Sequence, residues 1–276
     1  MDLQPDQRPA LWDDHIALYE EVFEPLTRAL AAAAIDRLDP TPGERVIDIG
    51  AGTGGAALML AARGANVLAV DASPRMVERI RARLAERPDT APRVRAEIMD
   101  GTALAVADAT MDAALSVFGV VLFPDAAAGV AEMTRVLKPH GRAALVTWTE
   151  PENYRLMAEL LAAIRAAIPD FPPPPRPPPQ LRFKDEAEFR TLLEGGGLRD
   201  VTIERVTGRL EAPGARWLAQ RLAFAPGMAA LLGMLGERRE DVTAAFVERI
   251  EAAQGRGPIA LAAVAFVGSG RAPGKS

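Results

Sequence analysis

A glycine-rich segment near the start of the chain has the residue types and spacing of a ligand-binding turn. In VIDIGAGTGG, residues 46–55, branched apolar residues typical of a buried strand are followed by four glycines. Glycines between a strand and a helix leave backbone amides uncovered at the positive end of the helix dipole, so an anionic ligand group can approach. Gly50, Gly52 and Gly55 also have the G-x-G-x-x-G spacing of dinucleotide-binding proteins, which keeps a nicotinamide or flavin enzyme as an alternative.

Three acidic residues lie at the ends of the first three expected strands. Asp71 follows Gly50 by 21 residues (71 − 50 = 21), where a carboxylate can accept both ribose hydroxyls of an adenosine. Asp48 lies two residues before Gly50, where its charge would repel a pyrophosphate and favour an ammonium group. Asp100 follows the third strand, in IMDG. The combination favours a nucleoside that carries an amino acid.

The elements that position these residues alternate between strand and helix. Short apolar runs predict strands, amphipathic stretches of about 10 to 15 residues predict helices, and KPHG at 138–141 is expected to be a turn. Ser73 and Asp125 are the expected N-caps of two of the helices. This alternation predicts an α/β fold with a doubly wound, mostly parallel sheet. The expected strands are 44–49, 66–70, 93–99, 112–117 and 142–148, and the expected helices are 54–64, 73–86 and 125–137.

The flanking regions are expected to complete a single domain over residues 1–276. Before the core at 41–150, residues 1–40 form a helical cap, with Pro25 dividing an apolar face that includes Tyr19. After the core, 151–200 hold a helix at 152–168 and a proline-rich segment at 169–179, which is expected to be an extended surface spacer. A strand at 200–210 precedes a helical insertion at 214–255, called the lid insertion below, and 256–276 form the last strand and tail.

Composition narrows the class of protein. The chain has 32 Lys and Arg against 37 Asp and Glu, and the arginines are scattered between acids, so we expect no nucleic-acid partner. The absence of cysteine excludes disulfides, thiolate metal sites and cysteine nucleophiles. No signal peptide is recognisable, and no apolar run reaches the roughly 18 to 20 residues of a membrane span, so we expect a soluble, cytoplasmic protein.

Several motifs together resemble class I S-adenosylmethionine-dependent methyltransferases. VIDIGAGTGG, VLAVDASPRMV, IMDGTAL, DAALSVFGVVLFPD, EMTRVLKPHGRAALVTW and GLRDVTIERV look like the successive motifs of this family, especially of its small-molecule, ubiquinone and menaquinone biosynthesis branch. The resemblance covers most of the chain and is strongest at 44–150. It implies a Rossmann-like sheet of seven strands, mostly parallel, whose last strand inserts antiparallel between its neighbours. His140 departs from the pattern, since the family usually has a glycine there; we expect an exposed turn residue.

The resemblance also implies roles for individual residues toward S-adenosyl-L-methionine and its product S-adenosyl-L-homocysteine. Asp71 would hold the ribose hydroxyls, and Asp48 would hold the loop or a water. The residues expected near the methionine part are Gly50, Ala51, Gly52, Ser116, Phe118 and Tyr19, and those expected near the adenine are Ala72, Met76, Asp100 and Gly101.

No catalytic side chain stands out. Transfer of a methyl group from a sulfonium depends mainly on holding the acceptor in line in a dry pocket, and His15, one helical turn before Tyr19, is only a weak candidate for a general base. We find no cluster of oxygen ligands for Mg²⁺ and no G-x-S-x-G hydrolase motif, so no metal is expected. The apolar lid insertion indicates a small, mainly apolar or aromatic acceptor, methylated on O, N or C. The alternatives are an NAD(P)-dependent oxidoreductase and a non-catalytic binding module for S-adenosylmethionine.

Overall fold

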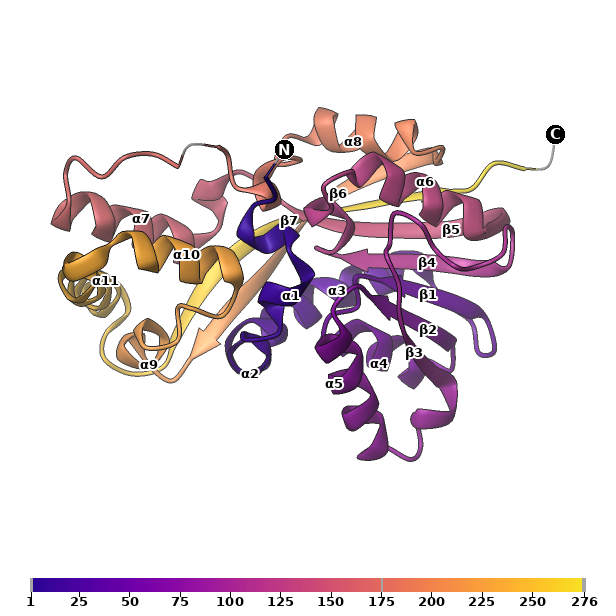
Figure 1. The fold of residues 1–276 in the computed structure, drawn as a ribbon, viewed down its shortest axis with the longest axis horizontal. Coiled ribbons are helices and arrows are strands. Elements are labelled where there is room, and N and C mark those ends of the chain that lie inside the picture. The colour runs from indigo at the N-terminus through magenta and orange to yellow at the C-terminus, as the bar shows by residue number, and fades with distance from the viewer. Residues whose placement is uncertain (1, 175, 275–276) are drawn as a thin grey trace.

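The chain forms one sheet of seven strands in the order β3-β2-β1-β4-β5-β7-β6 (Figure 1). The computed structural model describes residues 2–174 and 176–274. All neighbouring pairs from β3 to β5 are parallel, whereas β7 pairs antiparallel with both β5 and β6. The predicted doubly wound sheet with an inserted antiparallel last strand is therefore confirmed. The strands are β1 (Arg45–Ile49), β2 (Asn66–Asp71), β3 (Val94–Ile98), β4 (Met111–Val117), β5 (Leu137–Trp148), β6 (Arg199–Ala212) and β7 (Ile259–Arg271).

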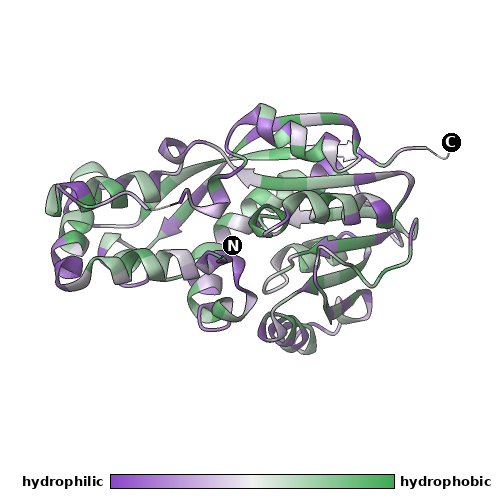
Figure 2. Ribbon diagram, turned by 45° about the horizontal axis from the view of Figure 1, so that its top comes forward, coloured by the Kyte–Doolittle hydropathy of each residue, from purple (hydrophilic) through white to green (hydrophobic). Residues whose placement is uncertain are grey.

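Helices cover both faces of the sheet. On one face lie α3 (Glu24–Leu38), α4 (Gly55–Ala62) and α5 (Pro74–Ala85), and on the other lie α6 (Ala126–Val136) and α8 (Glu186–Gly195). Figure 2 shows apolar residues along most of the central strands, whereas the helices carry both apolar and polar residues. Because side chains alternate across a strand, each helical layer packs on its own apolar core.

The two predicted N-caps are confirmed. The Ser73 side chain accepts a hydrogen bond from the Met76 amide at the start of α5, and Asp125 accepts one from the Ala128 amide at the start of α6. Each side chain satisfies a backbone donor that has no partner within its helix.

The N-terminal cap breaks into short pieces before α3. α1 (Pro9–Trp12) and α2 (Ile16–Leu18) are followed by a π-helical turn over Tyr19–Phe23. Pro25 stands in the first turn of α3, where its missing N–H leaves no helical bond unmade. The predicted division of the helix at Pro25 is thus observed as a π-turn that runs into a new helix.

The ends of β6 and β7 run past the other strands into an outer lobe. This lobe contains α7 (Arg155–Ala167), α9 (Ala215–Ala219), α10 (Pro226–Met234) and α11 (Arg239–Gln254) (Figure 1). The lid insertion is therefore three helices, α9 to α11. α7 begins at Arg155 rather than at the predicted 152, because Pro151–Asn153 form a 3-10 turn.

The expected turn at KPHG is wrong in part. β5 already begins at Leu137 and includes these residues, since Leu137 pairs with Met111 and the His140 amide donates to the Ala272 carbonyl at 3.2 Å. The register shifts after Met111, and His140 has a φ of 63° and is exposed. The chain thus bends at His140 inside a paired strand.

The proline-rich segment has neither helix nor strand at 171–174 and 176–178, and it is mostly exposed there. The Gln4 side chain donates to the Pro177 carbonyl at 3.0 Å, and Arg176 donates to the Asp2 carbonyl at 2.9 Å. The spacer is thus fastened to the N-terminal segment. Residue 175 of this segment and residues 275–276 of the tail lie outside the described residues. In the part of the chain that the structure describes, no helix has both the length and the apolar character needed to cross a bilayer.

Candidate functional site

The glycine turn joins β1 to α4 at the carboxyl edge of the sheet. Gly50, Gly52 and Gly54 have φ values of 70°, 54° and 84°, a region that favours glycine. A Cβ on Gly50 would lie 2.8 Å from the Gly119 backbone, and one on Gly54 would lie 2.9 Å from the Ile80 side chain. A Cβ on Gly52 would meet nothing within 4 Å, so close packing fixes the two ends of the turn and its middle stays uncovered.

Asp71 is bonded directly to this turn. The Gly52 amide donates to Asp71 Oδ2 at 2.8 Å, and the Ser73 amide donates to Oδ1 at 2.9 Å. Burial raises the pKa of Asp71 above its ordinary value, and these two hydrogen bonds oppose the rise. A carboxylate is therefore positioned beside the uncovered middle of the glycine turn.

The ends of β2 and β3 form an apolar shelf beside Asp71. Ile98 is the register partner of Asp71 and is 52% exposed, and Ala72 is also exposed. Asp100 is exposed two residues further on, and its carboxylate accepts from the amide and hydroxyl of Thr102 at 2.8 and 2.7 Å. Sequence reasoning missed Ile98, although an apolar residue at the end of a strand and two residues before Asp100 was a visible clue.

Two predicted adenine residues are buried. Met76 is 3% exposed, in the apolar core. Gly101 is also buried, and a Cβ there would lie 2.4 Å from the Phe123 ring. The backbone at Gly101 therefore approaches an aromatic side chain so closely that no larger residue fits.

Asp48 is a buried acid next to the glycine turn. Its side chain is 1% exposed, and Oδ2 has no hydrogen-bond partner among the described residues. Burial raises the pKa of Asp48 to about 7, the charge of Asp71 adds to the rise, and a hydrogen bond from the Ala57 amide opposes it. Asp48 lines a cavity of about 20 Å³ together with Tyr19, Glu24, Thr27, Arg28, Ala31, Gly50, Ala51, Thr53, Gly55, Ala56 and Val117.

A buried ion pair clamps the N-terminal cap onto the glycine turn. Arg83 Nη1 lies 2.5 Å from Glu24 Oε1 and 3.0 Å from the Thr53 carbonyl. The Thr53 hydroxyl also donates to Glu24 at 2.9 Å. Sequence reasoning missed this network, although Arg83 follows Ile80 and Met76 on the apolar face of its helix, where an unpaired charge is unfavourable.

An aromatic cluster continues from the glycine turn toward the outer lobe. Phe118, with a φ of 59°, stacks on Trp148 with centroids 4.2 Å apart, and Trp148 stacks on Tyr154 at 4.8 Å. Phe23 contacts Trp148 at 6.0 Å and stacks on Phe224 of the lid insertion at 4.8 Å. Tyr19 contacts Phe23 at 5.7 Å and Trp12 at 6.0 Å. We call these seven residues the aromatic cluster; it includes two of the three tryptophans and both tyrosines of the chain.

Ser116 braces the backbone around the glycine turn. Its hydroxyl donates to the Ile49 carbonyl at 2.8 Å and accepts from the Val120 amide at 2.9 Å. Both partners are backbone groups, so the Ser116 side chain ties the end of β4 to the end of β1.

His15 joins the N-terminal cap to the lid insertion. Its Nδ1 lies 2.7 Å from the Ala223 carbonyl, a contact that requires the proton on Nδ1. Nearby, the Gly227 amide donates to Asp6 at 2.7 Å, and Arg221 pairs with Glu21 at 3.1 Å. These contacts make His15 part of a joint between the N-terminal cap and the lid insertion.

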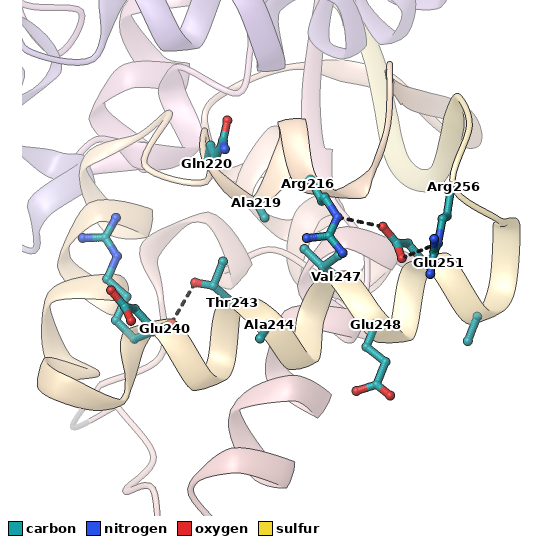
Figure 3. Close-up of a pocket in the computed structure, with 12 residues that line it drawn as sticks. Arg216, Ala219, Gln220, Glu240, Thr243, Ala244, Val247, Glu248, Glu251 and Arg256 are labelled. Carbon is teal, nitrogen blue, oxygen red and sulfur yellow. Dashed lines mark hydrogen bonds and ion pairs between the residues drawn. The ribbon is translucent and has the colours of Figure 1, made fainter.

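A larger hollow of about 940 Å³ lies elsewhere, between α9 and α11 (Figure 3). Glu251 pairs there with Arg216 at 3.3 Å and with Arg256 at 3.5 Å. None of its lining residues belongs to the glycine turn or the acids beside it. We therefore do not assign this open, charged surface to the site.

The structure thus brings most of the predicted residues to one edge of the sheet. Tyr19, Asp48, Gly50 and Ala51 line one cavity, and Gly52 is bonded to Asp71. Within residues 2–174 and 176–274, no group of three or more His, Cys, Asp or Glu side chains is arranged to hold a metal ion. A glycine turn, an acid on the next strand and an apolar shelf define a Rossmann-like nucleoside-binding fold.

Comparison with known proteins shows that the chain is similar to methyltransferases. Residues 46–141 match the family model described as a methyltransferase domain. A demethylmenaquinone methyltransferase from Corynebacterium kroppenstedtii is 42% identical over 115 residues, which are 42% of this chain and 46% of that protein. An uncharacterized protein from Mycobacterium bovis is 34% identical over 59% of this chain and 58% of its own length. The chain thus spans about half the length of these relatives.

Solved structures share the fold. The YcgJ protein of Bacillus subtilis aligns with 89% of this chain and 98% of its own, with a TM-score of 0.58 and 20% identity. The [4+2]-cyclase SpnF aligns with 90% of this chain and 81% of its own, with a TM-score of 0.53 and 20% identity. Residues 46–141 thus form a methyltransferase domain, and the chain is similar to class I S-adenosylmethionine-dependent methyltransferases.

Proposed function

We propose that the chain binds S-adenosyl-L-methionine at the carboxyl edge of the sheet and transfers its methyl group to a small, mainly apolar or aromatic acceptor. The observation that carries this proposal is the pairing of an uncovered glycine turn with Asp71, which the Gly52 amide holds in place at 2.8 Å. A carboxylate in this position can accept the two ribose hydroxyls of an adenosine. The exposed Ile98 and Ala72 offer the adenine an apolar surface, with Asp100 at its border.

The acids of the site suit a positively charged ligand. Asp48 and Asp71 are close enough for the charge of one to raise the pKa of the other. An ammonium or sulfonium group nearby would relieve that repulsion, whereas a pyrophosphate would add to it. This electrostatic balance supports S-adenosylmethionine over a nicotinamide dinucleotide.

The chain's own contribution to the reaction is positioning and exclusion of water. Bound S-adenosylmethionine supplies a methyl group that is already activated on a positively charged sulfur. The aromatic cluster provides apolar walls, and the Glu24–Arg83 pair holds the N-terminal cap over the turn. Holding an acceptor in line in such a pocket can lower a barrier by roughly 7 to 11 kcal/mol.

Among the described residues, neither the two tyrosines of the aromatic cluster nor His15 offers a strong general base beside this pocket. Burial raises the pKa values of both Tyr19 and Tyr154, so both phenols stay neutral near pH 7. His15 Nδ1 is engaged by the Ala223 carbonyl. We therefore propose an acceptor that is nucleophilic, or that ionises, without a strong base from the protein.

The aromatic cluster supports a flat, apolar acceptor. Stacked side chains of the N-terminal cap, of the ends of β4 and β5, and of the lid insertion meet there. Aromatic walls favour aromatic ligands through large apolar contact areas and offset stacking. The relatives named demethylmenaquinone methyltransferase support the same chemical class, a ring compound with oxygen substituents.

Two measurements on the purified chain test the proposal. Thermal unfolding with S-adenosylhomocysteine or with NAD(P) compares the ligands, and stronger stabilisation by NAD(P) would favour an oxidoreductase instead. A mass-spectrometric screen with labelled methyl donor over phenols, quinones, amines and polyketide-like compounds then tests for transfer. Binding of S-adenosylhomocysteine without transfer to any acceptor would favour a non-catalytic binding module.

A further inference from the structure

Tyr154 has an unusual position in the aromatic cluster. It lies just before α7, where it forms an isolated bridge to Ala263 of β7. Its ring is almost parallel to that of Trp148, with an interplanar angle of 2° and centroids 4.8 Å apart. Trp148 in turn stacks on Phe118 at the end of β4. Tyr154 is thus one aromatic ring away from a residue at the edge of the proposed methyl-transfer site.

The hydroxyl of Tyr154 is left unsatisfied. Its oxygen is buried, and no described residue forms a hydrogen bond with it. A buried tyrosine hydroxyl usually has a hydrogen-bond partner. Burial removes its hydrogen bonds to water, and leaving the hydroxyl unpaired is unfavourable. Burial also raises the pKa of this phenol, so the hydroxyl keeps its proton and remains a donor.

A second unfavourable feature lies in the same stack. Phe118 adopts a φ of 59°, a left-handed conformation that is strained for a bulky residue. Strained backbone and unsatisfied polar groups are destabilising, and they concentrate where a protein binds its ligands. The two features thus lie on either side of Trp148, within the part of the apolar core next to the proposed methyl-transfer site.

We propose that Tyr154 determines acceptor specificity by donating a hydrogen bond to a ring oxygen of a planar aromatic acceptor that packs in the aromatic cluster. The inference rests on the proposed function and specifies its acceptor further. The neutral phenol provides one directed donor in an otherwise apolar wall. A carbonyl or hydroxyl oxygen on the acceptor satisfies it, whereas a plain hydrocarbon leaves it unpaired. Discrimination between these two kinds of ligand follows from the buried polar group itself.

Thr147 provides a matched control. Its hydroxyl is also buried and has no partner among the described residues. Thr147 precedes Trp148 in β5 and therefore points to the opposite face of the sheet, the face of its neighbour Phe266 and of helices α6 and α8. Thr147→Val and Tyr154→Phe each remove one unsatisfied hydroxyl with little change of shape, but only Tyr154 lies in the aromatic cluster.

The experiment measures binding by equilibrium dialysis, with and without S-adenosylhomocysteine. The probes are 2-methyl-1,4-naphthoquinone and 2-methylnaphthalene, which differ in the two ring oxygens. We expect Tyr154→Phe to weaken binding of the quinone about 10-fold, equivalent to about 1.4 kcal/mol, and to leave binding of the hydrocarbon unchanged. Thr147→Val should bind both probes as the wild type does.

Thermal unfolding provides a second readout. Since both substitutions remove a buried unsatisfied hydroxyl, both should raise the melting temperature of the unliganded protein, by about 2 to 4 °C. A lower melting temperature of Tyr154→Phe, or equal affinity of wild type and Tyr154→Phe for the quinone, would overturn the proposal. The same holds if the wild type binds neither probe. Because dialysis needs no turnover, failure of the methyl-transfer screen alone would refute the proposed function and not this assignment.

Discussion

The sharpest consequence of the structure concerns the buried carboxyl of Asp48. Burial and the neighbouring charge of Asp71 raise its pKa from 3.8 to about 7. The folded protein therefore binds a proton at Asp48 that the unfolded chain has already released between these two pH values. Substitution of Asp48 by Asn replaces the ionisable group with a neutral one of nearly the same shape and removes this linkage.

The size and sign of the effect follow from the two pKa values. The folded form holds the proton more tightly, so the stabilisation by protonated Asp48 is complete below pH 4 and is lost as pH rises to about 7. The full difference from 3.8 to about 7 corresponds to on the order of 4 kcal/mol. Relative to the wild type, Asp48→Asn should therefore gain roughly 2 to 3 kcal/mol of unfolding free energy between pH 5 and pH 8, and little more above pH 8.

Urea unfolding of the unliganded protein at pH 5, 6, 7 and 8 measures this difference. Asp170→Asn is the matched control, because Asp170 is an exposed aspartate of the proline-rich segment. A constant difference for Asp48→Asn over the same range would refute the reasoning, since the carboxyl would then titrate alike in the folded and unfolded chains.

The same carboxyl predicts a pH-dependent affinity for the methyl donor. Ionised Asp48 attracts a ligand that carries ammonium and sulfonium charges, and with a pKa of about 7 the ionised fraction rises about 10-fold from pH 6 to pH 8. Calorimetry should show S-adenosylmethionine binding tightening by up to that factor in the wild type. Asp48→Asn should bind more weakly and lose this pH dependence.

Three further substitutions test other parts of the site. Asp71→Ala should weaken S-adenosylhomocysteine binding by about 1 to 3 kcal/mol in calorimetry, through the loss of charge-assisted bonds to the ribose; unaltered affinity would contradict that role. Arg83→Met should lower the unfolding free energy by about 3 to 5 kcal/mol because it leaves Glu24 buried and unpaired, and Glu24→Gln in the same chain should restore part of the loss. Gly54→Ala should destabilise more than Gly43→Ala, since both glycines have positive φ (84° and 89°) but only Gly54 would clash, with Ile80; equal losses in urea unfolding would count against close packing at the turn.

The local parts of the fold could be predicted from the sequence. Strand and helix periodicity depends on neighbours within one element, and capping by Ser73 and Asp125 depends on residues three positions away. The glycine turn and Asp71 were also recognisable, because each belongs to a short local motif. Parallel neighbouring strands then bring these motifs to one edge of the sheet. The turn predicted at KPHG was wrong in part because pairing with Met111 and Ala272 could not be seen in the local sequence.

The contacts that close the site could not be predicted, because they join distant segments. His15 meets Ala223 across 208 residues, and Arg83 meets Glu24 across 59. The aromatic cluster is likewise assembled from the N-terminal cap, the ends of β4 and β5 and the lid insertion. A single sequence specifies the apolar faces of these segments but not which faces meet.

A crystal structure of the chain with S-adenosyl-L-homocysteine tests the central claim most directly. We predict that the ribose hydroxyls bind the Asp71 carboxylate, with the adenine against Ile98 and the amino acid beside the turn at Gly50–Gly52. A nucleoside bound away from Asp71 and this turn, or no binding of the nucleoside at all, would contradict the account.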